Sequence, residues 1–163
     1  MSAKSGKHPS RTAAPDAISL LKADHRQVES WFAEFGKSRS GSKQQRLAEN
    51  ICEALSTHTR IEEEIFYPAF LQATADQDLH HEAVVEHDAA KKLIAEIQRM
   101  TASDEYFGAK VTVLAEMIKH HVKEEERPGG MFALARKSSM DLKSLGQALL
   151  ARKKQLQAHP KAA

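Results

Sequence analysis

The sequence predicts an all-α protein, built as an up-down-up-down four-helix bundle with an additional C-terminal helix. Apolar residues recur at alternating steps of three and four along four long segments, which is the spacing of an amphipathic helix. The segments between them are short and polar, so consecutive helices are expected to be antiparallel neighbours. No segment shows the strict alternation of apolar and polar residues that a half-buried strand requires.

The first two helices are expected on either side of a loop at residues 36–42, which is rich in glycine and serine. The first helix should begin at Asp16. The second should be kinked or ended by Pro68, because proline cannot donate the backbone hydrogen bond of a helix interior. The first apolar stripe comprises Ile18, Leu21, His25, Val28, Phe32 and Phe35. The second comprises Leu47, Ile51, Leu55, His58, Glu62, Ile65 and Ala69.

A polar connection at residues 73–79 should lead to the third helix, and a turn at residues 101–105 to the fourth, with Ser103 or Asp104 as its N-cap. The fourth helix should end near Pro128. A last helix with a basic polar face is expected from about residue 140 to residue 157. The third stripe comprises Val84, His87, either Ala90 or Lys91, Ile94 and Ile97. The fourth comprises Val111, Leu114, Ile118, His121 and Glu125.

Length and composition favour a single soluble domain in the cytoplasm. The 163 residues carry a net charge of +2 and contain no apolar run of membrane-spanning length. We expect flexible tails at residues 1–15 and 158–163, with the bundle between them at residues 16–157. The N-terminal segment lacks the apolar stretch of a secretory signal, and the single cysteine, Cys52, excludes an internal disulfide. The small net charge gives no reason to expect a nucleic-acid or membrane partner.

Each of the four bundle helices carries one histidine in its apolar stripe: His25, His58, His87 and His121. Two of them are followed four residues later by a glutamate, Glu62 or Glu125, which places both side chains of each pair on one helix face. Six polar groups therefore point into an apolar core, where an unpaired carboxylate would cost on the order of several kcal/mol. Mixed nitrogen and oxygen donors suit one or two transition-metal ions, of which iron is the natural choice.

A single histidine in an apolar stripe is usually an ordinary core residue. Its recurrence in four helices, with the same glutamate spacing twice, favours a metal site over a polar network without metal. Glu124 or Glu126 could replace Glu125, because the pattern fixes the rotation of the helix only loosely. Asp24 and Asp88 could accept hydrogen bonds from the ligand histidines. Aromatic residues are expected in the core, namely Trp31, Phe32, Phe66, Tyr67 and Phe70.

These residues resemble the hemerythrin-like proteins, which share the HHE cation-binding domain, and in particular a bacterial subgroup with the pattern H-HxxxE-H-HxxxE. The resemblance extends from residue 17 to about residue 155. The matching segments are Asp24-His25, His58-Thr-Arg-Ile-Glu62-Glu-Glu-Ile-Phe-Tyr-Pro68, Glu86-His87-Asp and His121-Val-Lys-Glu-Glu125-Glu, of which the second is the most specific. The resemblance implies two non-haem iron ions with a bridging oxygen, held by His25, His58, Glu62, His87, His121 and Glu125.

The chain departs from the oxygen-carrying hemerythrins at Ala83, where those proteins have an additional histidine four residues before the ligand that corresponds to His87. The remaining pattern resembles bacterial proteins linked to peroxide breakdown, iron handling and nitric-oxide or redox response. We therefore expect an open iron position that meets hydrogen peroxide or dioxygen, with catalase-like peroxide decomposition as the candidate activity. The alternative is a non-enzymatic module that binds or senses iron, oxygen or nitric oxide.

Overall fold

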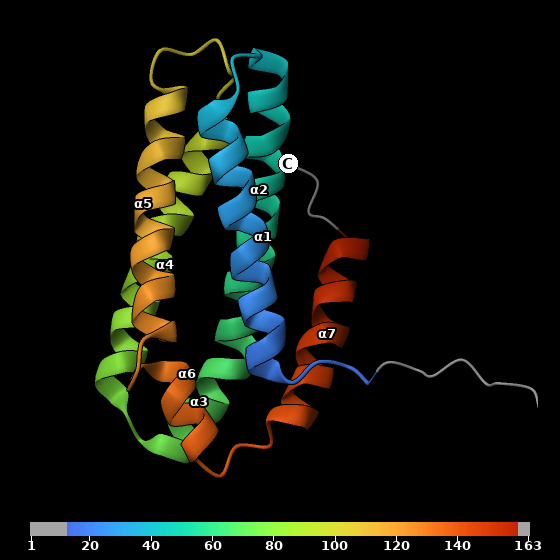
Figure 1. Cartoon of the computed structure of the whole chain (residues 1–163), viewed down its shortest axis with the longest axis vertical. Helices are drawn as coiled ribbons and strands as arrows, with labels where there is room; N and C mark the ends of the chain where they lie inside the picture. Colours follow the sequence, from blue (N-terminus) through green and yellow to red (C-terminus); the bar gives the residue numbers. More distant parts are fainter. Residues whose placement is uncertain (1–12, 160–163) are drawn as a thin grey trace, which may run out of the picture.

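The computed structural model describes residues 13–159 and contains no strand among them. Four long helices form the bundle: α1 (Ala17–Lys37), α2 (Gly41–Ile61), α4 (Gln77–Ile97) and α5 (Phe107–Glu126). A further long helix, α7 (Leu142–Ala158), lies against α1 and α2 on the outside of the bundle (Figure 1). The predicted all-α bundle with an additional C-terminal helix is confirmed. Within the predicted tails, residues 1–12 and 160–163 lie outside the described part of the chain.

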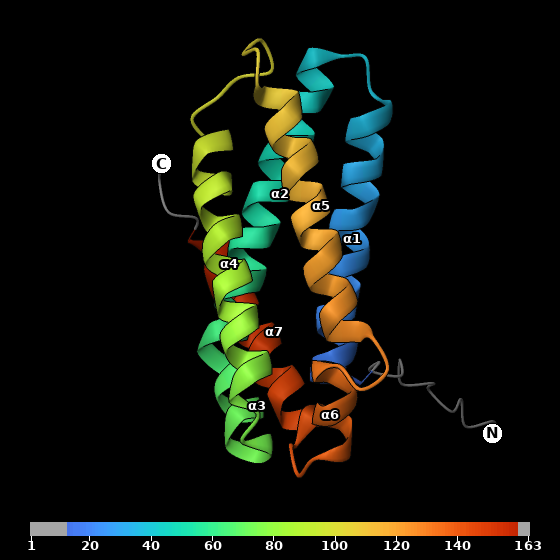
Figure 2. The same cartoon turned by 90° about the vertical axis from the view of Figure 1, so that its left-hand side faces the viewer.

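Two short helices, α3 (Tyr67–Thr74) and α6 (Met131–Lys137), close the end of the bundle opposite the α1–α2 and α4–α5 loops (Figure 2). We did not predict α6, because seven residues are too few to show a helical stripe. The turn before it contains Gly129 at a φ of 74°, a left-handed conformation that favours glycine. Between residues 13 and 159, no helix is both long enough and apolar enough to cross a membrane.

Capping side chains make two of the loops shorter than predicted. Asp16, Ser40 and Asp76 each accept a hydrogen bond of 2.8–3.3 Å from the backbone N–H three residues later. These bonds satisfy amide groups that would otherwise lack a partner in the first turn of α1, α2 and α4. The first loop is therefore confined to residues 38–40, and the connection before α4 to residues 75–76.

The predicted N-cap of α5 is wrong. The helix begins at Phe107, after Tyr106, and has no side-chain cap. The carboxylate of Asp104 instead accepts hydrogen bonds from the backbone N–H of Thr101 at 2.6 Å and from its hydroxyl at 3.2 Å. Asp104 therefore stabilises the turn between α4 and α5 rather than the first turn of α5.

Pro68 neither ends the second helix nor merely bends it. The helix continues from α2 through one π-helical turn, η1 (Glu62–Phe66), into α3. In this turn the amide of Tyr67 donates to the carbonyl of Glu62, five residues earlier. In a regular α-helix a residue five positions on would be rotated by about 140°, but the wider π turn brings it back to nearly the same face. Glu62 and Tyr67 consequently both point into the bundle, and the predicted stripe at Ile65 and Ala69 is displaced toward the surface.

The core consists of two apolar clusters with a polar layer between them. On α1, His25 lies between Leu21 of one cluster and Val28 of the other. On α2, His58 is similarly flanked by residues of the two different clusters, Leu55 and Ile61. The apolar clusters hold the bundle helices together, and the polar layer between them contains the candidate functional residues.

Helix α7 approaches the start of α1 through Gly146. A Cβ atom at this position would lie 2.3 Å from the carbonyl oxygen of Pro15 and 2.8 Å from the amide nitrogen of Ala17. Elsewhere on α7, Leu149 is fully buried and Arg152 pairs with Glu64 of η1 at 2.6 Å. Gly146 thus provides the close approach, and the other contacts hold the helix in place.

Replacing Gly146 with alanine should destabilise the protein by about 1–3 kcal/mol, the usual cost of forcing a methyl group into a packed site. The added Cβ meets backbone atoms of residues 15–17, which cannot rotate away as a side chain would. Thermal unfolding measures the effect. Gly36→Ala is the matched control, because a Cβ there meets nothing within 4 Å and alanine is a better helix former. Equal midpoints for the two variants would contradict the proposed role of Gly146.

Candidate metal centre

The structure brings all six predicted ligand residues together in the polar layer. The four histidines come from the four different bundle helices. Glu62 follows His58 at the junction of α2 and η1, and Glu125 follows His121 on α5. Every one of the six is between 0% and 5% exposed: His25, His58, Glu62, His87, His121 and Glu125. Burial of this many polar groups in one layer requires mutual contacts or a bound cation.

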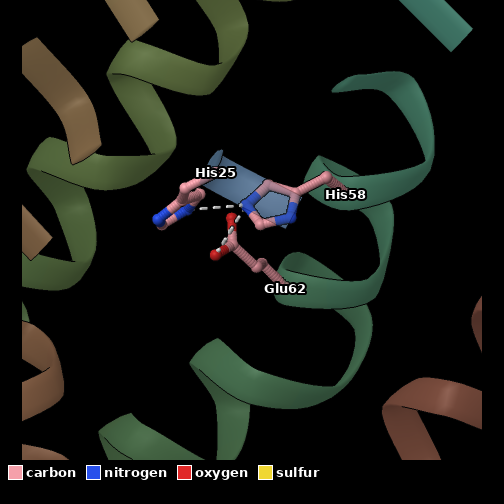
Figure 3. Close-up of side chains that lie close together, drawn as sticks. All are labelled: His25, His58 and Glu62. Atoms are coloured by element: carbon pink, nitrogen blue, oxygen red, sulfur yellow. Dashed lines mark hydrogen bonds and ion pairs between the residues drawn. The ribbon is translucent and has the colours of Figure 1, made fainter. Parts of the chain in front are cut away.

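Two histidines form the first half of the centre. The Nε2 atoms of His25 and His58 lie 3.1 Å apart, with their rings turned toward each other (Figure 3). Glu62 Oε1 lies 3.1 Å from His58 Nε2, and Glu125 Oε2 lies 3.4 Å from His25 Nε2. This half therefore gathers two imidazole nitrogens and one oxygen from each carboxylate.

The second half repeats the arrangement. The Nε2 atoms of His87 and His121 lie 3.2 Å apart. The remaining oxygens of the same carboxylates face them, Glu62 Oε2 at 3.2 Å from His87 and Glu125 Oε1 at 3.4 Å from His121. Each glutamate thus directs one oxygen to each half, which is the arrangement that a carboxylate bridging two cations needs.

Tyr67 belongs to the second half, although we expected it only as a core aromatic. Its hydroxyl donates to Glu125 Oε1 at 2.9 Å and to Glu62 Oε2 at 3.3 Å, and it lies 3.1 Å from His87 Nε2. Burial and the two carboxylates raise the pKa of the phenol well above its usual value. The π turn explains why sequence spacing missed this residue, because Tyr67 reaches the centre only through the extra residue in that turn.

Each imidazole turns its outer nitrogen, Nδ1, toward a carboxylate. The pairs are His25–Glu126 at 2.7 Å, His58–Asp24 at 3.3 Å, His87–Glu63 at 2.9 Å and His121–Glu86 at 2.5 Å. Such contacts favour the tautomer that carries its proton on Nδ1 and leaves the Nε2 lone pair facing inward. Two facing lone pairs about 3 Å apart repel each other unless a proton or a metal ion lies between them.

Basic groups hold the outer carboxylates in turn. The contacts are Arg26–Glu126, Lys153–Asp24, Lys91–Glu63 and His120–Glu86. Hydrogen bonds from the histidines lower the pKa of Glu63 and Glu126. Burial raises the pKa of Asp24 and Glu86, but hydrogen bonds from the histidines and the nearby positive charges together lower it below the usual value. The acceptors are therefore anionic at neutral pH. Lys153 lies on α7, so the C-terminal helix contributes to the surroundings of His58.

Two buried oxygens support a cation in this layer. Glu62 Oε1 and Glu125 Oε2 have no hydrogen-bond partner among residues 13–159, and both face the His25–His58 half. Burial would raise the pKa of Glu62, but His58 and His87 lower it well below the usual value. Anionic oxygens directed at imidazole nitrogens fit the ligand set of a transition metal with mixed nitrogen and oxygen coordination. Assignment of the six residues as metal ligands stays a prediction.

The structure separates the three neighbouring glutamates of α5. Glu125 is 2% exposed and faces the centre, whereas Glu126 contacts His25 from outside and Glu124 pairs with Arg127 near the surface.

The two aspartates that we expected to accept hydrogen bonds from the ligand histidines differ in their positions. Asp24 approaches His58 rather than its own neighbour His25, and Asp88 lies on the surface beside Lys91. Side chains adjacent in a helix diverge, so each outer acceptor comes from a different helix than its histidine.

Comparison with known proteins agrees with this reading. The family described as "Hemerythrin HHE cation binding domain" matches residues 16–129. A crystal structure of a hemerythrin HHE cation-binding domain-containing protein from Mycobacterium kansasii has the same fold, with a TM-score of 0.72, 23% identity and 88% of each chain covered. A protein named DNA nickase from Nostoc sp. is 29% identical over 107 residues, which are 66% of this chain and 30% of that protein. The chain therefore spans less than a third of that relative. The family match and the histidine–glutamate clusters together support metal binding.

Proposed function

Because the chain belongs to the hemerythrin HHE cation-binding domain family, we propose that it is a cytoplasmic protein that holds a pair of non-haem iron ions. An open iron position would meet a small oxidant, hydrogen peroxide or dioxygen. The observation that carries this proposal is the division of each carboxylate between two histidine pairs, at 3.1–3.4 Å from the nearest imidazole nitrogens.

The predicted ligands and the outer carboxylates have separate roles in this proposal. His25 and His58 would hold one ion, His87 and His121 the other, and Glu62 and Glu125 would bridge them. Bound iron supplies redox equivalents and Lewis acidity for reaction with a peroxide. The outer carboxylates keep Nδ1 protonated and fix the orientation of each ring, which raises the basicity of Nε2. Apolar clusters flank the layer on both sides along the bundle.

The proposal is tested by expressing the full chain in iron-supplied medium and measuring metal content, absorption spectrum and oxygen release from hydrogen peroxide. About two iron ions per chain, charge-transfer bands of a bridged iron pair and rapid oxygen release are the expected results. Absence of iron, or a single zinc ion without such bands, would overturn the proposal. Bands without peroxide turnover would favour the non-enzymatic alternative.

One contact favours a sensing role as the second candidate. Asp24 joins His58 of the centre to Lys153 of α7, so a change at His58 reaches the outer helix through a single carboxylate. A module that binds dioxygen or nitric oxide could use this connection to alter the docking of α7. Hydrogen exchange in residues 142–158 should then change when the ligand binds, whereas an enzyme with a static α7 would show no such change.

Tyr67→Phe is expected to weaken iron binding in the His87–His121 half by about 10–100-fold, the range typical for loss of a group that supports a metal ligand. The phenol oxygen is the only atom removed, and it lies within 3.3 Å of three predicted ligands. Tyr106→Phe is the matched control, because Tyr106 is the second of the two tyrosines and is 64% exposed. Unchanged iron affinity in Tyr67→Phe would show that the phenol does not support the centre.

Metal uptake by chelator-treated protein should release protons and strengthen as the pH rises from about 6.5. Burial would lower the pKa of His58, but Glu62 and Asp24 raise it to about 10. Above its ordinary pKa and below about 10, this imidazole keeps a proton that the metal must displace. Each proton released makes the apparent affinity rise about tenfold per pH unit. Metal titrations between pH 6.5 and pH 8.5 in weak and strong buffers measure both effects, and a flat affinity would contradict the expectation.

A further inference from the structure

A cavity of about 160 Å³ lies beside the centre, and its exposed lining residues, Gln27 and Gln157, belong to α1 and α7. Its inner end is formed by the four histidine rings, whereas Glu62, Tyr67 and Glu125 are absent from its lining. The cavity therefore reaches the centre at its histidines and not at the carboxylates or the phenol. A ligand from solvent could reach the centre through this cavity.

The volume exceeds what a diatomic oxidant or hydrogen peroxide needs. A water molecule takes up about 30 Å³ in the liquid, and a cavity of about 150 Å³ in another protein holds a benzene molecule. A site evolved only for two oxygen atoms would leave most of this volume empty. Its size fits a ligand with about six carbon atoms.

The walls and ends of the cavity differ in polarity. Apolar side chains line the walls, among them Val28, Trp31, Leu55, Ile118 and Val122. The histidines form a polar inner end, and Gln27 and Gln157 lie exposed at the outer end. The two charged lining residues, Asp24 and Lys153, neutralise each other. The cavity therefore suits an uncharged molecule with an apolar body and one small oxygen-bearing group.

We propose that this cavity binds an organic hydroperoxide whose apolar group is about the size of a six-carbon ring. The apolar group would contact the walls near Trp31, and the hydroperoxide group would face the histidines. This inference rests on the proposed function, which it deepens by naming the class of oxidant. Lys153 and Gln157 place α7 at the rim, so the C-terminal helix helps to set the size of ligand that is admitted.

Trp31 makes binding measurable, since it is the single tryptophan of the chain and lines the cavity. The iron-loaded full chain would be titrated with cyclohexanol, the unreactive alcohol that corresponds to cyclohexyl hydroperoxide. A saturable change in tryptophan fluorescence is expected, together with saturation transfer from protein to the ring protons of cyclohexanol in NMR. Methanol at the same concentrations should produce neither effect.

Ala54→Phe supplies the structural test, because Ala54 lines the cavity and a phenyl ring would fill it. Its affinity for cyclohexanol should fall by about tenfold or more, and Ala54→Leu should show a smaller loss with less risk to folding. Ala89→Phe, on the exposed face of α4, should bind like the parent chain. Equal binding by Ala54→Phe and Ala89→Phe, or no saturable binding to a chain that contains iron, would overturn the inference alone. A chain without iron would overturn the proposed function instead.

Discussion

Glu125→Gln should abolish iron retention, whereas Glu124→Gln should leave the iron content unchanged. Glu125 directs Oε2 to His25 and Oε1 to His121, at 3.4 Å in each case. Glutamine keeps the shape of the side chain but replaces one anionic oxygen with an NH₂ group, which cannot bind a cation. One half of the centre would therefore lose a ligand, and the negative charge shared by both halves would fall.

The neighbouring residue Glu126 should give an intermediate result. Its carboxylate contacts Nδ1 of His25 at 2.7 Å, so Glu126→Gln would weaken the orientation of a ligand without removing one. Loss of such a partner typically costs about 10–100-fold in metal affinity. Glu124 pairs with Arg127 instead, and within residues 13–159 its side chain forms no ion pair with a predicted ligand.

Metal analysis of the three purified variants, after dialysis against a weak chelator, distinguishes these cases. The expected order of iron content is Glu124→Gln, then Glu126→Gln, then Glu125→Gln. Circular dichroism confirms that each variant is folded. The opposite result would be iron retained by Glu125→Gln but lost by Glu124→Gln or Glu126→Gln. It would show that α5 is rotated so that a different glutamate faces the centre.

The sequence predicted the four bundle helices and the residues of the polar layer for the same reason. A stripe with a period of 3.6 residues defines one buried face, and a histidine within that stripe must enter the core. This reasoning worked for His25 and His87 because their helices are regular. It also worked for Glu62 and Glu125, since each lies only four residues after a histidine of the same helix.

The sequence did not predict features that depend on the departure from regular geometry or on contacts between helices. Tyr67 enters the centre because the π turn shifts the buried face of the helix by about one residue. In the sequence, Pro68 indicated only that the second helix would be kinked or ended there. The partner of His58 is Asp24 from α1, a pairing that no spacing within one helix can reveal. Phe132 of α6 stacks on His25, with ring centroids 5.8 Å apart, although α6 was too short to predict.

Removal of the metal should lower the midpoint of thermal unfolding by about 10 °C. A ligand present at about 1,000 times its dissociation constant stabilises the folded state by about 4 kcal/mol. For a chain of this size, each kcal/mol corresponds to about 2–4 °C. Without a cation, the facing Nε2 atoms and the unpaired oxygens of Glu62 and Glu125 must be satisfied by protons alone, inside a layer that is at most 5% exposed.

Thermal unfolding of the iron-loaded chain, the chelator-treated chain and the reloaded chain measures this effect. Reloading should restore the original midpoint, which separates loss of metal from irreversible damage. Glu125→Gln is the informative control: its midpoint should not respond to chelator, because it should hold no iron to lose. If parent and Glu125→Gln responded equally to chelator, the stabilising metal would lie outside the polar layer. If neither responded, the histidines and glutamates would have to be stable as a hydrogen-bonded network, and the bundle would not depend on a metal for its stability.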